Sequence, residues 1–161
     1  MLIYSSRLVL SAEQGRGMMI AMSQPSDLLG LYLHLARASA LRRQPHARDR
    51  LLVISGVIAT HIGLMSVAAY CRQAILEHNP GHMVRRWNNF ADALEDSDFL
   101  HFLKQVQRRY PQEKAERMLS TLGIDMAQER QTYYNDTEYA AALLGVSTDT
   151  LDELFGSAVS N

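Results

Sequence analysis

The 161-residue sequence contains a single cysteine, Cys71. No intramolecular disulfide can therefore form, and nothing in the cysteine content favours an oxidising compartment. The sequence also lacks an ordered secretory signal, because Arg7, Glu13 and Arg16 interrupt the apolar stretch near the N-terminus. From these absences we expect a cytoplasmic protein in which residues 1–24 form a weakly ordered arm or a short strand.

Motifs of common catalytic chemistry are absent as well. There is no phosphate-cradling glycine loop, nucleophile elbow, cysteine pair or zinc-protease motif, so we expect no cofactor and favour a binding protein over an enzyme. His78 and His82 flank an Asn-Pro-Gly turn, with Glu77 adjacent and Cys71 two turns upstream, but this spacing matches no set of metal ligands, and we expect no metal. His61 stands alone in an apolar stretch, which is more typical of a core histidine than of a ligand or base.

No segment shows the sustained alternation of apolar and polar residues that is typical of a β-strand. Hydrophobic residues make up 47% of the chain and charged residues 20%, as in ordinary globular proteins, so the chain should fold. Apolar residues recur at helical spacing, and capping residues, Gly and Pro mark the ends of the segments. The predicted helices are residues 26–43, 47–62 and 66–78, a segment from Val84 to Leu94, one capped by Ser97, residues 111–123, one through Tyr134, and two short helices around Leu143 and Leu151.

These segments predict an all-α fold, a compact bundle of about six helices that ends in a short helix pair. We expect a helical core domain at residues 25–124 and an acidic helical segment at residues 125–161.

Residues 51–70 contain no charged side chain for twenty residues, about the length that spans a bilayer. One alternative is therefore a membrane anchor. His61 lies at the centre of the stretch, where an imidazole is costly in lipid, and Gly63 and Ser66 are stop and start signals that divide it. The favoured interpretation is two buried helices.

Charge is distributed unevenly along the chain. Residues 1–88 carry ten Arg and four Asp or Glu, a net charge of +6, whereas residues 89–161 carry six Lys or Arg and thirteen Asp or Glu, a net charge of -7. This division suggests a basic face that meets an acidic partner or is masked by the acidic segment of the same chain. The alternative is an incidental distribution over solvated helix faces.

The predicted hairpin from Arg48 to Pro80 has small residues at its helix crossing and a terminal proline. It resembles a single tetratricopeptide repeat. Proteins of that family are scaffolds built from helix pairs, and they bind other proteins. No second copy is evident, so the resemblance implies a helical hairpin and a protein-binding role but no regular solenoid. The residues that match are Gly56, Ala59, Ala68 or Ala69, Tyr70, Ala74 and Pro80.

Residues 137–155 place Ala141, Gly145 and Leu151 where a helix-turn-helix needs a small residue, a turn glycine and a core aliphatic. The segment resembles the helix-turn-helix of excisionase-type and mercury-resistance-type regulators, with Ser147 as the cap of the second helix. That resemblance implies nucleic-acid binding. The second helix offers only Thr and acidic residues for such a contact, however, and acidic groups repel phosphate.

The strongest candidate for a binding surface is basic. If the chain folds as predicted, the loop near residue 46 and the turn near residue 80 lie at the same end of the bundle, where they gather Arg48, Arg50 and the histidines His46, His78 and His82. The alternative is that the Arg stems cover apolar surface and that Trp87 belongs to the core. The predicted partner-binding residues are Arg42, Arg43, Arg85, Arg86 and Trp87.

The sequence thus favours a protein–protein interaction module, and self-association is a further expectation because an unrepeated hairpin can complete its core against another copy. A nucleic-acid-associated regulator and a membrane-anchored protein are the alternatives.

Overall fold

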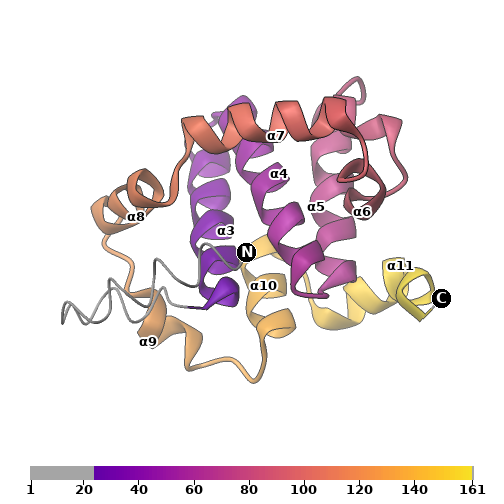
Figure 1. Cartoon of the computed structure of the whole chain (residues 1–161). Coiled ribbons are helices and arrows are strands. Elements are labelled where there is room, and N and C mark those ends of the chain that lie inside the picture. The colour runs from indigo at the N-terminus through magenta and orange to yellow at the C-terminus, as the bar shows by residue number, and fades with distance from the viewer. Residues whose placement is uncertain (1–23, 161) are drawn as a thin grey trace.

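A computed structural model describes residues 24–160, which contain nine α-helices, one short 3-10 helix and no strand (Figure 1). The all-helical prediction is confirmed. The arm predicted at residues 1–24 lies outside the described residues except for Gln24. The elements in chain order are α3 (Pro25–Leu41), α4 (Pro45–His61), α5 (Met65–His78), η1 (Met83–Arg86), α6 (Phe90–Ala93), α7 (Ser97–Arg109), α8 (Gln112–Thr121), α9 (Met126–Arg130), α10 (Asp136–Leu144) and α11 (Thr148–Ser160).

Helices α3, α4 and α5 form the centre of the molecule, with α4 packed against both of the others. Helices α6 and α7 cover α4, α8 and α10 pack against α3, and α11 packs against α5. Figure 1 shows α7 crossing the three central helices near one end. Because α4 has neighbours on several sides, nine consecutive residues, 51–59, are buried. Burial inside protein therefore accounts for much of the uncharged run.

The segment 51–70 is divided between two helices. Helix α4 ends at His61, Gly63 adopts the left-handed conformation with φ of 84°, and α5 begins at Met65. A residue without a Cβ adopts this conformation at little cost, which explains the reversal at this point. Among residues 24–160 no helix has the length and apolarity to cross a membrane. The favoured prediction of two helices across residues 51–70 is therefore confirmed, and the alternative of one continuous anchor there does not fit the structure.

A single helix across residues 84–94 was also a wrong prediction. The chain forms η1, then extended backbone at Trp87 and Asn89, and then the one-turn helix α6. The Trp87 indole Nε1 donates to Asp96 Oδ2 at 3.1 Å, and the Asn89 side chain accepts the backbone N–H of Asp92. These side-chain hydrogen bonds stabilise the extended backbone between η1 and α6.

Three helices begin one residue or so away from their predicted starts. Helix α7 is capped by Asp96, whose carboxylate accepts the Asp98 N–H at 2.8 Å, so Ser97 is the first helical residue and not the cap. Helix α3 begins at Pro25, before Ser26, and α5 begins at Met65, before Ser66. Proline at a first helical position loses no hydrogen bond, which allows the earlier start of α3.

The two segments that carry family resemblances have the expected local shape. Helices α4 and α5 form a hairpin, and α10 and α11 are joined by Gly145 in the left-handed conformation. The Ser147 hydroxyl accepts the Thr150 N–H at 3.1 Å, as predicted for a cap. Helix pairs of both kinds occur in many unrelated proteins, so the two family relationships stay predictions.

Candidate functional site: the basic end of the bundle

The end of the bundle formed by the start of α4 and the end of α5 brings several predicted residues together. His46, in the first turn of α4, lies edge-on to His78, the last residue of α5, with ring centroids 6.0 Å apart. The α3–α4 link and the α5–η1 turn therefore lie at the same end, as the hairpin predicts. We call this region the basic end and define it as residues 42–50 and 78–86.

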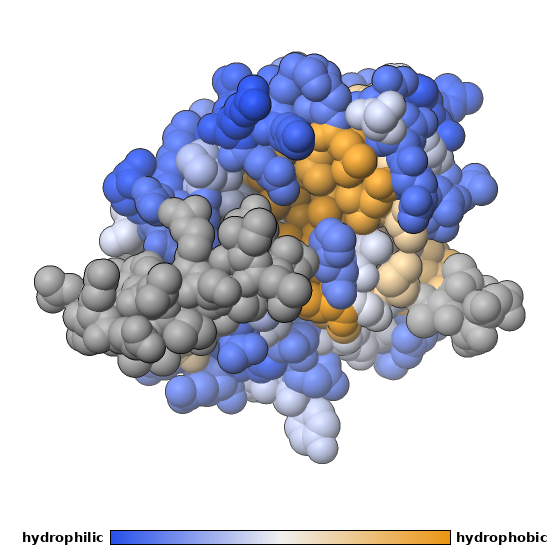
Figure 2. All heavy atoms as spheres, viewed as in Figure 1, coloured by the Kyte–Doolittle hydropathy of each residue, from blue (hydrophilic) through white to orange (hydrophobic). Residues whose placement is uncertain are grey.

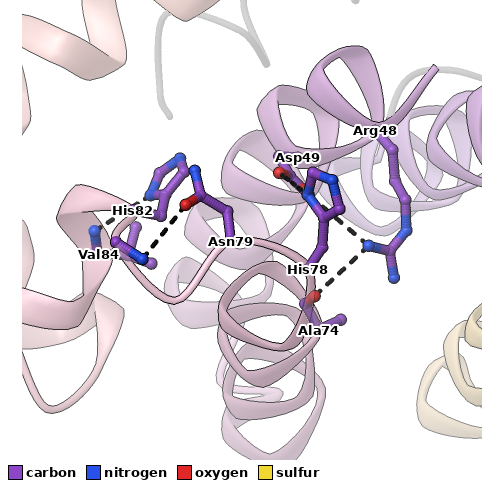
Figure 3. Close-up of polar contacts among 8 residues, drawn as sticks. Arg48, Asp49, Ala74, His78, Asn79, His82 and Val84 are labelled. Carbon is purple, nitrogen blue, oxygen red and sulfur yellow. Dashed lines mark hydrogen bonds and ion pairs between the residues drawn. The ribbon is translucent and has the colours of Figure 1, made fainter.

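A buried carboxylate organises the basic end. Asp49 is only 3% exposed, and its Oδ2 lies 2.7 Å from His78 Nδ1 (Figure 3). Its Oδ1 has no hydrogen-bond partner among the described residues and lies 3.6 Å from Arg48 Nη1. Arg48 in turn donates to the Ala74 carbonyl at 3.4 Å. A buried charge is costly unless it is paired, so His78 and Arg48 together stabilise Asp49 and join α4 to the end of α5.

The Asp49–His78 pair fixes the orientation of the imidazole. With Nδ1 directed at the carboxylate, Nε2 is the ring atom that Asp49 does not engage, and the His78 side chain remains 34% exposed. An oriented, partly exposed imidazole can donate a hydrogen bond to an anionic group when protonated.

His82 has a structural role in the turn. Its Nδ1 accepts the Val84 N–H at 3.2 Å (Figure 3). The His82 ring also packs edge-on against Phe102. Burial lowers the pKa of His82, and the charge of Asp49 opposes this effect. Asn79 Oδ1 accepts the Gly81 N–H at 3.2 Å in the same turn. These contacts form a compact Asx-type turn that positions η1 beside the hairpin.

Cys71 lies two turns before His78 on α5. Cys71 is fully buried, and burial raises the pKa of its thiol to about 12. In the part of the chain that the structure describes, no group of three or more His, Cys, Asp or Glu side chains has the arrangement needed to hold a metal ion.

Arg86 and Trp87, both predicted as partner-binding residues, are already engaged within the chain. Arg86 pairs with Asp98 at 3.1 Å, and its guanidinium lies 4.7 Å from the centroid of the Trp87 ring. Trp87 is half-buried and packs edge-on against Phe99, with ring centroids 5.5 Å apart. The alternative that Trp87 belongs to the core therefore describes most of its contacts, and its indole supports Arg86 and η1.

The other three predicted residues, Arg42, Arg43 and Arg85, are exposed. Among residues 24–160 none of these three forms an ion pair with an acidic side chain. Arg43 has a φ of 58° and is the one described residue other than glycine with a positive φ. This conformation costs a residue with a Cβ roughly 1–2 kcal/mol.

The acidic C-terminal segment does not neutralise the basic end through the ion pairs of the described residues. Arg130 pairs with Asp136 inside the acidic segment, and Glu129 of that segment lies 3.3 Å from His34 Nε2 of α3. His34 is buried, as expected of a core histidine, and its Nε2 also lies 3.0 Å from the Tyr139 hydroxyl. Burial lowers the pKa of His34, which favours the neutral ring.

His61, in contrast, is exposed, so its prediction as a core histidine is wrong. It lies at a recess of about 230 Å³ where α3, α4 and α7 meet, lined by apolar residues such as Val57 and Leu103. Figure 2 shows a hydrophobic hollow on this face, below the hydrophilic residues along α7. Partial burial there lowers the pKa of His61.

Sequence reasoning missed the Asp49–His78 pair. A signal was present, because Asp49 is the one acidic residue within a run of arginines from residue 42 to residue 50. An isolated acidic residue among basic neighbours suggests a specific partner inside the protein. The partner, His78, is 29 residues away and is brought close only by the hairpin.

Comparison with known proteins gave no relative: no protein-family model matches the chain, and neither a curated protein nor a solved structure is detectably similar to it.

Proposed function

We propose that this chain is a helical protein–protein interaction module whose basic end binds an acidic segment of a partner protein. Arg42, Arg43 and Arg85 make the contacts, Arg86 contributes from beside Asp98, and Trp87 holds η1 in place. Guanidinium groups form paired hydrogen bonds with carboxylates, which suits such a partner. We retain the expectation of a cytoplasmic location, which is compatible with a single, fully buried thiol at Cys71.

The observation that carries this proposal is the strained conformation of Arg43. Glycine adopts a φ of 58° without cost, yet an exposed arginine occupies the position. Strained residues cluster at binding sites, where the surrounding structure holds them in place for function. Arg42 and Arg85, exposed and without ion pairs among the described residues, add basic groups to the same end.

The test is affinity capture of the tagged full-length chain from a nuclease-treated lysate. The variant R42E/R43E/R85E reverses three charges at the basic end. Its matched control, R108E/R109E/R117E, reverses three exposed arginines on α7 and α8 and changes the net charge by the same amount. A protein captured by wild type and control but not by the basic-end variant supports the proposal. A protein captured equally by all three contradicts it.

A nucleic-acid-associated regulator is the second candidate, because exposed arginines without ion pairs also suit phosphate. The exposed face of α11 argues against a helix-turn-helix contact, since it presents Asp149, Asp152 and Glu153. Binding of a labelled duplex by the purified chain, falling steeply as salt is raised and lost in the basic-end variant, favours this candidate over the protein partner.

A further inference from the structure

A recess of about 150 Å³ lies where α3, α4, α5 and α10 meet. Ala36 and Ala40 of α3 and Ala74 of α5 line it with methyl groups, and these short side chains leave the space open. Leu52 of α4 and Leu143 of α10 form larger apolar walls. An apolar space of about this volume holds a group the size of a benzene ring, so the recess has room for one large apolar side chain.

The charge at this recess is positive. Arg37 and Arg48 line it, and none of the described residues around it is acidic. Arg37 is exposed and forms no ion pair in the described part of the chain. The Arg48 guanidinium is held at the edge, because its Nη1 donates to the Ala74 carbonyl at 3.4 Å and lies 3.6 Å from Asp49 Oδ1 (Figure 3). Charge complementarity therefore favours an apolar group that has acidic neighbours.

The recess adjoins the basic end. Ala40 and Arg48 line it, and the α3–α4 link that carries Arg42 and Arg43 connects these two residues. The link is tight, since the Arg43 N–H donates to the Ala40 carbonyl at 3.0 Å. Leu41, between Ala40 and Arg42, is 77% exposed. A segment bound at Arg42 and Arg43 therefore lies beside both an exposed leucine and an apolar recess.

We propose that this recess binds one large apolar side chain, a phenylalanine or a leucine, of the acidic partner segment. An acidic residue next to that side chain then pairs with Arg37. The inference rests on the proposed function and adds a requirement to it, because the segment needs an apolar residue with acidic neighbours. A buried apolar side chain contributes much of the affinity of an interface, whereas exposed ion pairs contribute little, so the recess selects among acidic segments.

The experiment compares two labelled peptides of equal length and charge by fluorescence anisotropy with the full-length chain. One is a short polyglutamate with a central phenylalanine, and the other has serine at that position. Wild type should bind the phenylalanine peptide about 10- to 100-fold more tightly, because a large apolar side chain is buried. A40W fills the recess from an exposed position and should abolish this preference, whereas A127W, the same change at an exposed alanine of α9, should keep it.

Arg37 has a matched pair of variants as well. R37Q should weaken binding of the phenylalanine peptide more than binding of the serine peptide, since Arg37 pairs beside the recess. R117Q, at an exposed arginine of α8, should change neither affinity. Serine-peptide affinity that stays at the wild-type value shows that each variant is folded.

A second readout needs no variant. In wild type, the phenylalanine peptide should shift the backbone amide signals of Ala36, Ala74 and Leu143, which the serine peptide should leave in place. Absence of these shifts contradicts the proposal.

The outcomes separate this inference from the proposed function. A preference for phenylalanine that A127W keeps and A40W loses supports the recess as its cause. Equal affinity of wild type for the two peptides, or a preference that A40W keeps, contradicts the inference and leaves the proposed function standing. Binding of neither peptide contradicts both. Free phenylacetate that competes as strongly as the phenylalanine peptide assigns the recess to a small acid and also contradicts the inference.

Discussion

Helices α4 and α7 bury their residues in different ways. In α4 every residue from 51 to 59 is buried, whereas α7 buries Phe99, Leu103 and Val106 and exposes most positions between them. The spacing of four and then three residues in α7 is the pattern of a helix with one covered face. Helix α4 has α3, α5, α6 and α7 as neighbours and has no such face. Periodicity therefore identifies an outer helix, while a central helix is recognised by its breakers and its small residues.

The largest expected difference in the free energy of unfolding is between substitutions on the two faces of α7. Phe99 is fully buried and packs against the rings of Trp87 and Phe90, whereas Leu100 is 41% exposed. Phe99→Ala should lower the free energy of unfolding by about 3–5 kcal/mol, because it removes contacts and leaves a cavity. Leu100→Ala should change it by less than about 0.5 kcal/mol. Urea unfolding followed by circular dichroism measures both, and equal effects would show that α7 is not a one-sided helix.

The next largest effect on stability is expected at two glycines of the central helices, where a neighbouring aromatic ring packs close to the backbone. A Cβ at Gly56 of α4 would lie 2.2 Å from the Phe90 ring, whereas at Gly30 of α3 it would lie 3.0 Å from the Tyr139 ring. Gly56→Ala should destabilise the protein by about 1–3 kcal/mol, since α6 must shift outward. Gly30→Ala should cost less, because the overlap is smaller. Thermal unfolding of the two variants ranks them, and the reverse order would contradict the contact between α4 and α6.

A smaller effect is expected from the polar contact between α4 and α5. His78→Ala leaves the buried Asp49 carboxylate without its closest donor and should cost about 1–3 kcal/mol. Asp49→Ala in the same background should then cost less than it does in wild type, because the two residues stabilise each other. A double-mutant cycle by urea unfolding gives the coupling. Strictly additive effects would mean that the pair does not join the hairpin at this end.

The smallest effect is a change of stability with pH that arises where α10 packs on α3. Burial lowers the pKa of His34 below its usual 6.5. As the pH falls, the unfolded chain therefore protonates at this residue before the folded chain does. Stability from this group is present above pH 6.5 and is lost as the pH falls below that value. In His34→Gln the free energy of unfolding should change less between pH 7.5 and pH 5.5, with His61 and His82 supplying a remaining dependence of the same sign. An unchanged dependence in the variant would contradict this assignment.

The features of the fold that could be predicted were those that depend on neighbouring residues in the sequence, such as helix ends. Gly63 and Gly145 ended helices as expected, because a left-handed turn needs a residue without a Cβ. The break at residues 87–89 was not predictable, since it depends on the hydrogen bond from Trp87 to Asp96 and on the room that Gly56 leaves for Phe90. Local propensity does not encode such tertiary contacts.

The candidate site likewise has features that could be predicted from the sequence and features that could not. Proximity of residues 46 and 78 follows from a hairpin, and a hairpin was predictable. The engagement of Arg86 by Asp98 was not, because it requires the positions of η1 and α7 relative to each other. The positive φ of Arg43 also has no sequence signal, as arginine does not favour that conformation.

The central claim, that the basic end receives an acidic segment, is tested most directly by a backbone amide NMR titration with a short polyglutamate peptide. A polylysine peptide of equal length serves as the control. The account predicts salt-sensitive shifts confined to residues 42–50 and 78–86, with no such shifts in α8 and none caused by polylysine. Shifts centred on α8, or no shifts in the basic end, would contradict it.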